Sequence, residues 1–215
     1  MNLYDSSMAA FRSGSTDQAA RLADELVRTA RADADVQGEI DGLCMIARVA
    51  LRRADVPRVA MFAAEARNLA RDRADRRLER MPLHLQAVAA RLQGNFESAR
   101  ELYTESIALN RQLGEDRMVA AEHRNLAYVE LHDGNAARAR ELFSSSANLA
   151  RACGYEALEP YLLLDSAVLA LEAGDTTGAQ ERLRKATASF EAAGQIPDPD
   201  DAAELEWLRG RLLKN

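Results

Sequence analysis

Glycine recurs at intervals of forty residues along most of this chain. The positions are Gly14, Gly94, Gly134 and Gly174, with Ala54 in the place of the missing glycine. A second ladder in the same register consists of Ala34, Ala74, Gly114, Gly154 and Gly194. A third is formed by the slim residues Ala19, Val59, Ala99, Ala139 and Ala179. A fixed period of this length is typical of solenoids, in which one supersecondary unit stacks on copies of itself.

Each period indicates two helices joined by a short turn. In the third repeat, apolar residues at helical spacing predict helices over Glu79–Gln93 and Phe96–Leu113, separated by Gly94-Asn95, because glycine commonly ends a helix in the left-handed conformation. No strand pattern is present, so we expect an all-α fold in a single domain over 1–215. The expected repeats cover residues 1–34, 35–74, 75–114, 115–154 and 155–194, followed by a capping segment at 200–214 whose helix spans about Asp201–Leu213.

Composition excludes several classes of protein. The 215 residues are 47% hydrophobic, which is too apolar for a disordered chain, and the net charge of −6 gives no global attraction to nucleic acid. The arginine-rich segment 67–80 is interrupted by acidic residues and lacks aromatic residues for base stacking, so we interpret it as a solvated helix end. No signal peptide or membrane span is expected. Cys44 and Cys153 lie several helices apart, which predicts free thiols and a cytoplasmic protein.

The repeats resemble tetratricopeptide repeats. The fourth repeat carries this resemblance in Leu126-Ala127, Gly134-Asn135, Ala139 and Phe143, and the third and fifth repeats match it closely. A period of forty is similar to the longer variety found in kinesin light chains and in sensor domains of bacterial transcription regulators. The resemblance implies a right-handed superhelix whose first helices line a concave groove for a partner's peptide. It also implies that Asn125, in an Asn-Leu-Ala run, holds the backbone of such a peptide.

The period also predicts which residues of each first helix face the groove; we call this set the stripe. Residues four apart lie on one helix face, and on this basis the stripe of the fourth repeat is Arg124, Tyr128 and His132. The candidate peptide-binding residues are Arg48, Arg52, His84, Arg91, Arg124, Asn125, Tyr128 and His132. An unpaired charge is costly to bury, so we expect this stripe to face solvent. His123, one residue before Arg124, is expected to pack between helices.

This basic lining leads to the hypothesis of a groove for an acidic or C-terminal-carboxylate peptide, because arginine forks suit carboxylates. The alternative is that these arginines pair with Glu122, Glu130 or Asp41, or are only solvated. Catalysis is not expected, because a Cys44–His84 pair would lack an oxyanion hole and an orienting group. No metal or other cofactor is expected, since His84, His123 and His132 lack ligand spacing.

The sequence therefore predicts a protein-binding or peptide-binding adaptor without enzymatic activity. The alternative is a ligand-sensing module of a bacterial transcription regulator, and a second alternative is an enzyme that uses the groove. No direct binding to nucleic acid or membrane is expected. A homodimer is a further hypothesis, because Leu3, Tyr4, Met8 and Phe11 form an uncapped apolar face on the first repeat.

Overall fold

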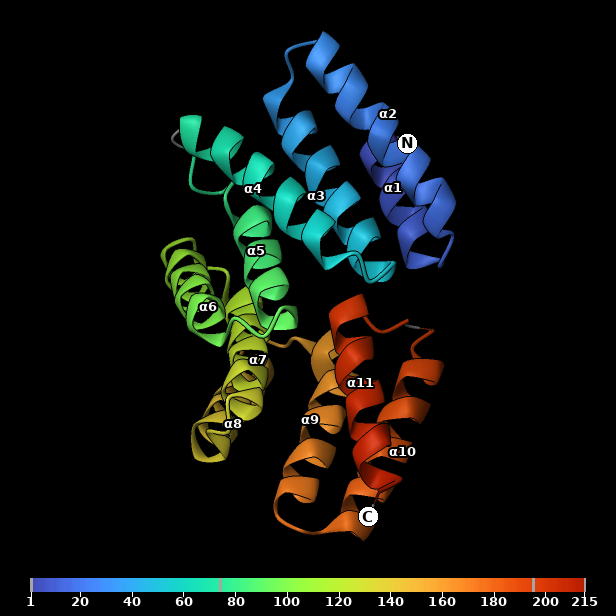
Figure 1. The fold of residues 1–215 in the computed structure, drawn as a ribbon, viewed down its shortest axis with the longest axis vertical. Coiled ribbons are helices and arrows are strands. Elements are labelled where there is room, and N and C mark those ends of the chain that lie inside the picture. The colour runs from blue at the N-terminus through green and yellow to red at the C-terminus, as the bar shows by residue number, and fades with distance from the viewer. Residues whose placement is uncertain (1, 74, 195, 215) are drawn as a thin grey trace. The chain divides into compact units, whose positions relative to one another are not determined.

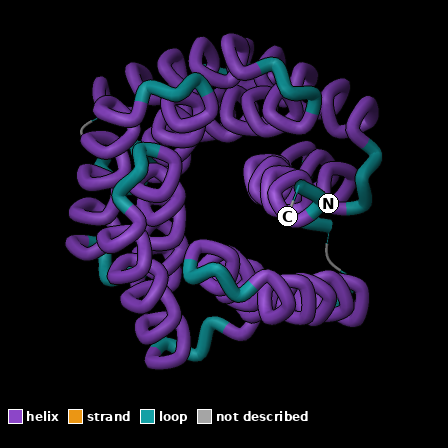
Figure 2. The backbone as a smooth tube through the Cα atoms, turned by 60° about the horizontal axis from the view of Figure 1, so that its bottom comes forward, coloured by secondary structure: helices purple, strands orange, loops and turns teal. Residues whose placement is uncertain are grey.

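The computed structural model describes residues 2–73, 75–194 and 196–214, and this part of the chain contains helices and no strand (Figure 2). Eleven α-helices and one short 3₁₀ helix follow one another along it (Figure 1). They are α1 (Leu3–Arg12), α2 (Thr16–Ala32), α3 (Val36–Arg52), α4 (Val56–Asp72), α5 (Arg80–Leu92), α6 (Phe96–Gln112), α7 (Asp116–His132), α8 (Ala136–Ala152), η1 (Glu156–Leu158), α9 (Glu159–Glu172), α10 (Thr176–Ala192) and α11 (Pro199–Leu212). The predicted all-α fold is confirmed.

The helices form two units, an N-terminal half, Met1–Leu109, and a C-terminal half, Asn110–Asn215. In the N-terminal half, α3 packs against α2 and α4, as expected when the first helix of one repeat contacts the second helix of the repeat before it. In the C-terminal half, α7 pairs with α8 and α9 with α10, and α11 contacts both α9 and α10. These helices, which are adjacent in sequence, are therefore neighbours in space.

The three ladders have distinct structural roles. Ala19, Val59, Ala99, Ala139 and Ala179 are completely buried, because they lie where two helices approach closely. The described glycines of the other two ladders all adopt positive φ, between 59° and 84°, and Ala34 and Ala54 adopt φ of 56° and 57°. Ala74 lies outside the described residues. At Gly94 the following N–H, that of Asn95, donates to the carbonyl of Ala90 at 3.0 Å, which closes the helix end.

The residue after each turn starts the next helix. Asp35, Asp55, Asn135 and Asp175 stand at equivalent positions, and each side chain accepts a hydrogen bond from the backbone N–H three residues later. These caps satisfy N–H groups that lack a partner within the helix.

The ends of α5, α6 and α11 lie within two residues of those predicted. Two helices differ in their first turns. The first helix of the fifth repeat starts as the 3₁₀ turn η1, and Pro160 occupies the first turn of α9. The last helix begins at Pro199, two residues earlier than predicted, because proline is well tolerated in a first helical turn.

Candidate functional site

The candidate site lies in the C-terminal half, where α7 and α9 meet α11. Arg124, Tyr128 and His132 occupy one face of α7, as the spacing predicted, and α9 contributes Asp165. The opposite wall is α11, which turns Asp201 and Glu204 toward this face. Figure 1 shows α11 beside α9 and α10. The stripe predicted to bind an acidic peptide is therefore covered by an acidic helix of the same chain.

Arg124 is the centre of the contact and only 3% exposed. Its Nε donates to both carboxylate oxygens of Asp165, at 2.9 and 3.0 Å, and its Nη1 donates to the carboxylate of Asp201. The guanidinium also lies 5.1 Å from the ring centroid of Tyr161. Burial alone would lower the pKa of Arg124, but the charges of Asp165 and Asp201 outweigh burial and raise the pKa well above its ordinary value. Arg124 is thus a permanent cation held between carboxylates from two helices.

Tyr128 lies one turn further along α7 and is completely buried. Its hydroxyl donates to Asp165 at 2.9 Å and accepts from Arg124 Nη2 at 3.3 Å, and its ring packs edge-on against Phe143 at 5.0 Å. Burial, and then the charge of Asp165, raise the pKa of Tyr128 well above its ordinary value. The tyrosine stays neutral and orients the Asp165 carboxylate toward Arg124.

His132 forms the outer end of the stripe. Its Nε2 lies 2.8 Å from the carboxylate of Glu204, and its ring meets Trp207 edge-on at 5.2 Å. Trp207 is the single tryptophan of the chain. Because Glu204 and Trp207 both belong to α11, this end of the stripe recognises the helix through a charge and an aromatic ring.

The buried side of α11 combines acidic and apolar residues. It consists of Asp200, Asp201, Glu204, Leu205, Leu208 and Leu212. Burial raises the pKa of Asp201 to about 7 and that of Asp165 to about 6, although the positive charge of Arg124 opposes both shifts. From the sequence, α11 was predicted only as a cap, and Asp201, Glu204 and Asp165 were missed. The signal available was the acidic first turn of α11, but no sequence pattern states which surface a cap covers.

In the N-terminal half, the stripe on α3 is covered by α1. The guanidinium of Arg52 lies 3.9 Å from the ring centroid of Phe11 and donates to the Phe11 carbonyl at 3.1 Å, and Arg48 lies 4.8 Å from the same centroid. Both arginines remain half-buried. Phe11 is only 1% exposed, so it does not belong to an open N-terminal face as expected.

The expectation of a solvent-facing stripe is therefore wrong for half of its members. Arg91, Arg124, Asn125 and Tyr128 are buried, whereas Arg48, Arg52, His84 and His132 are half-buried. The physical reason is that a charge can be buried when carboxylates and hydroxyls satisfy it, as at Arg124. The peptide-binding role of the eight residues stays a prediction. His123 is half-buried beside Arg111, and burial lowers its pKa.

The arginine-rich segment also differs from a solvated surface. Arg67 is 5% exposed and pairs with Glu105 at 2.5 Å, while Arg71 and Arg76 pair with Glu79 at 3.4 and 3.1 Å. These three arginines are thus engaged with carboxylates of their own chain.

No catalytic arrangement is visible in the described residues. Burial, and then the charge of Asp41, raise the pKa of the Cys44 thiol well above its ordinary value, which is the opposite of what a nucleophile needs. Both cysteines are free thiols. No group of three His, Cys, Asp or Glu residues able to hold a metal occurs over 2–73, 75–194 and 196–214.

No helix in the described part of the chain has the length and apolar character needed to cross a bilayer.

Comparison with known proteins gives no match to a family model and no match among curated sequences. Solved structures do match. The apo form of RapI superposes with a TM-score of 0.77 at 11% identity, over 99% of this chain and 84% of RapI. A Rap protein complexed with competence and sporulation factor gives 0.74 at 16% identity, over 96% of this chain and 56% of that protein.

A third match is a signal transduction ATPase with numerous domains from Pyrococcus horikoshii, which carries a tetratricopeptide repeat sensor. The TM-score is 0.70 at 12% identity, over 97% of this chain and 31% of that protein. At such identities the comparison shows the fold alone, and that fold is the tetratricopeptide repeat solenoid predicted from the sequence.

Proposed function

We propose that this chain is a protein-binding adaptor without enzymatic activity, and that its C-terminal half takes an acidic amphipathic helix of a partner in the place now held by α11. The observation that carries this proposal is the contact of Asp201 and Glu204 with Arg124 and His132. The proposal also puts the chain in the cytoplasm, in keeping with its free thiols. A protein of similar fold supports a binding role, because a Rap protein was solved as a complex with competence and sporulation factor.

The face that α11 buries defines the chemistry of the partner. Asp201, Glu204, Leu205 and Leu208 are spaced i, i+3, i+4 and i+7, which is the anchor pattern of a helix that lies in a groove. Two carboxylates at the first two anchors meet Arg124 and His132, and leucines follow toward the carboxyl end. A partner helix with this order of acidic and apolar anchors fits the same stripe.

A partner must compete with a tethered helix. Tethering gives α11 an effective concentration on the order of millimolar, so an external helix of equal intrinsic affinity binds only the small open fraction of molecules. Loosening α11 without changing α7 or α9 should therefore reveal the site. Leu208 serves this purpose, because it is completely buried and lies outside the charged contact.

The test uses a labelled peptide with the sequence of residues 198–214, added to the full chain and to the full-length Leu208→Ala variant. We expect the variant to bind the peptide at least about tenfold more tightly, since truncating a buried leucine costs about 2–5 kcal/mol of docking. Fluorescence anisotropy measures binding. Trp207 emission of each protein without peptide reports how far α11 is released, because the peptide carries the same tryptophan.

The matched control is Leu213→Ala beside the same helix, because Leu213 is 89% exposed and its truncation should leave peptide affinity as in the wild type. A control peptide in which the glutamate at the position of Glu204 becomes alanine should bind more weakly. The proposal is contradicted if the peptide binds neither protein, or binds the wild type and Leu208→Ala equally.

A second candidate function is a ligand-sensing module of a bacterial transcription regulator. It is favoured by the likeness to a protein that carries a tetratricopeptide repeat sensor. The two candidates differ in what binding does. Both candidates require α11 to leave the stripe, so Trp207 emission alone does not separate them. A sensor in addition transmits occupancy to the rest of the chain, which hydrogen exchange of amides in α8 and α10 would detect, whereas an adaptor needs only capture.

A further inference from the structure

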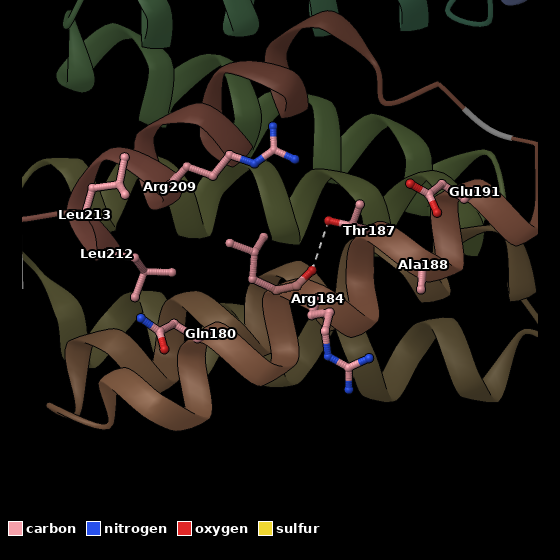
Figure 3. A pocket seen from close by; sticks show the side chains of 9 residues that line it. Gln180, Arg184, Thr187, Ala188, Glu191, Arg209, Leu212 and Leu213 are labelled. Carbon is pink, nitrogen blue, oxygen red and sulfur yellow. Dashed lines mark hydrogen bonds between the residues drawn. The ribbon is translucent and has the colours of Figure 1, made fainter.

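The outer face of α10 forms a groove with the end of α11 (Figure 3). Its volume is about 660 Å³, and its apolar surface comes from Leu183, Leu212 and Leu213. Leu213 is 89% exposed and lies with Leu212 at one end of the groove, whereas Glu191 lies toward the other end and Arg184 stands between them (Figure 3). This groove is separate from the face of α7 and α9 that binds α11.

The equivalent face of α2 shows what this surface does elsewhere in the array. Residues 160 positions earlier, which include Val27 and Arg31, border α3 and α4 of the following repeat. Val27 is 7% exposed, and Arg31 pairs with Glu39 and Glu65 at 2.6 Å each. The face is therefore a stacking face, on which one repeat receives the next. Within the described chain, α10 is followed only by α11.

The charge at one position of this face reverses in the last repeat. The column reads Arg31, Arg71, Arg111, Arg151 and Glu191. Arg31 and Arg71 both pair with glutamates of the following repeat, at Glu65 and Glu105 respectively. Because the fifth repeat carries glutamate instead, a body that stacks on α10 must place a cation opposite Glu191. The reversal makes this end face different from the internal stacking faces.

The same face carries its own cation. Arg184 precedes Glu191 by seven residues, two helical turns, so both project from one side of α10. Within the described residues, neither side chain has an opposite charge at ion-pairing distance, and both are exposed. The residues midway between them, Thr187 and Ala188, are small and allow close approach of a second helix. Charges of opposite sign thus flank a small-residue centre.

We infer that this face of α10 is a homodimer interface in which two copies pack their α10 helices antiparallel about a two-fold axis near Thr187 and Ala188. A two-fold axis makes an interface self-complementary, so Arg184 of each copy meets Glu191 of the other, and Leu183 and Leu213 are covered. The occupant is a second copy because the face supplies both members of the ion pair. This inference goes beyond the proposed function and uses a different surface.

The location differs from the dimer expected at the N-terminal repeat. There, Phe11 is already covered by Arg48 and Arg52. The outer face of α10 instead combines an exposed leucine with exposed charges of both signs, which makes it complementary to the same face of a second copy.

The test is charge reversal on the full chain, followed by sedimentation equilibrium over a wide concentration range. We expect the wild type to dimerise. Arg184→Glu and Glu191→Arg should each weaken the dimer at least about tenfold, since each places like charges opposite one another twice per dimer. The double variant Arg184→Glu/Glu191→Arg should regain wild-type affinity. An equimolar mixture of the two single variants should form a heterodimer, because each then meets its complement.

Lys185→Glu is the matched control, because Lys185 lies on α10 outside the groove and pairs with Glu181 of its own helix. It should leave the dimer unchanged, and circular dichroism should show all variants equally helical. A wild type that stays monomeric at high concentration would overturn the inference. So would a dimer indifferent to both single reversals, or single variants that fail to associate with each other.

Discussion

The two halves of the molecule cover the same stripe of their first helices in different ways. On α3, Arg52 lies over the ring of Phe11 and donates to a backbone carbonyl, so its partner from α1 is neutral. On α7, Arg124 and His132 meet the carboxylates of Asp201 and Glu204 from α11. The described contacts from α1 are thus made through a ring and a carbonyl, whereas those from α11 are made through carboxylates.

The contact on α7 differs further because it encloses a fully buried charge. On α3, Arg48 and Arg52 contact the ring of Phe11, Arg52 also donates to the Phe11 carbonyl, and both side chains remain half-buried. Arg124 is fully desolvated and depends on two carboxylates from separate helices. Removing either helix would leave a buried charge without full compensation, so we expect the C-terminal stripe to select for acidic partners.

The largest expected difference in stability between the halves follows from replacing Arg124. Arg124→Gln leaves Asp165 and Asp201 buried without their cation, and breaking a buried ion pair in this way typically costs about 3–5 kcal/mol. We expect this decrease in the free energy of unfolding, measured by urea titration of Trp207 fluorescence. Trp207 lies on α11, so the transition reports the C-terminal half.

Arg53→Gln is the matched control in the N-terminal half. Arg53 also pairs with an aspartate, Asp17 at 2.6 Å, but the side chains are 46% and 84% exposed. An exposed pair contributes about 0–1 kcal/mol, so the control should change stability little in a circular dichroism melt. Equal losses for the two variants would contradict the conclusion that burial distinguishes the halves.

A pH dependence of the C-terminal half is the next largest effect. Burial raises the pKa of Asp201 to about 7 and of Asp165 to about 6, from ordinary values of 3.8, against the opposing charge of Arg124. Between about pH 4 and pH 7, the folded state therefore binds more protons than the unfolded state. The stability that protonation gives is complete below about pH 4 and is lost as pH rises through about 6 to 7.

We expect the free energy of unfolding of the C-terminal half to fall by on the order of 2–4 kcal/mol between about pH 5 and pH 8. Urea titrations followed by Trp207 fluorescence across this range measure it. Asp201→Asn cannot ionise at this position, so its stability should vary less with pH. Stability that rises with pH over the same range would contradict the assignment.

The fold was predictable from the sequence because the forty-residue period and the local signals at helix ends agreed. The ladders set the period, and glycine and alanine marked the helix ends. The structure adds that Asp55 and Asn135, which follow these turns, cap the next helices. These are local signals that act within a few residues. The boundaries of α5, α6 and α11 were therefore predicted within two residues, and the differences in first turns fall at Pro160 and Pro199.

The candidate site was only partly predictable. Period and spacing correctly placed Arg124, Tyr128 and His132 on one face, because that depends on helix geometry alone. Burial depends instead on which surface α11 covers, and the contact of Arg124 with Asp201 joins residues 77 positions apart. The rule that arginine avoids the core failed here, since it holds only for a charge without a partner.

The turns between helices are a second place where the two halves differ. The described turns of the N-terminal half use both residue types, since Ala34 and Ala54 adopt φ of 56° and 57°, in the left-handed region that disfavours residues with a Cβ, beside Gly14 and Gly94. In the described C-terminal half, the positive-φ positions are glycines such as Gly134, Gly154 and Gly174. A Cβ at Gly134 or Gly174 would meet nothing within 4 Å, so backbone conformation alone determines the effect of substitution.

The smallest expected effect is therefore an exchange of alanine and glycine at these turns. Ala54→Gly relieves about 1–2 kcal/mol of left-handed strain but adds about 0.4–1 kcal/mol of unfolded-state entropy. We expect a net stabilisation of roughly 0.5–1 kcal/mol for Ala54→Gly and a loss of similar size for Gly134→Ala. Hydrogen exchange of amides in α3 and α8 measures the two changes separately, and an Ala54→Gly variant less stable than the wild type would show that the alanine turn is not strained.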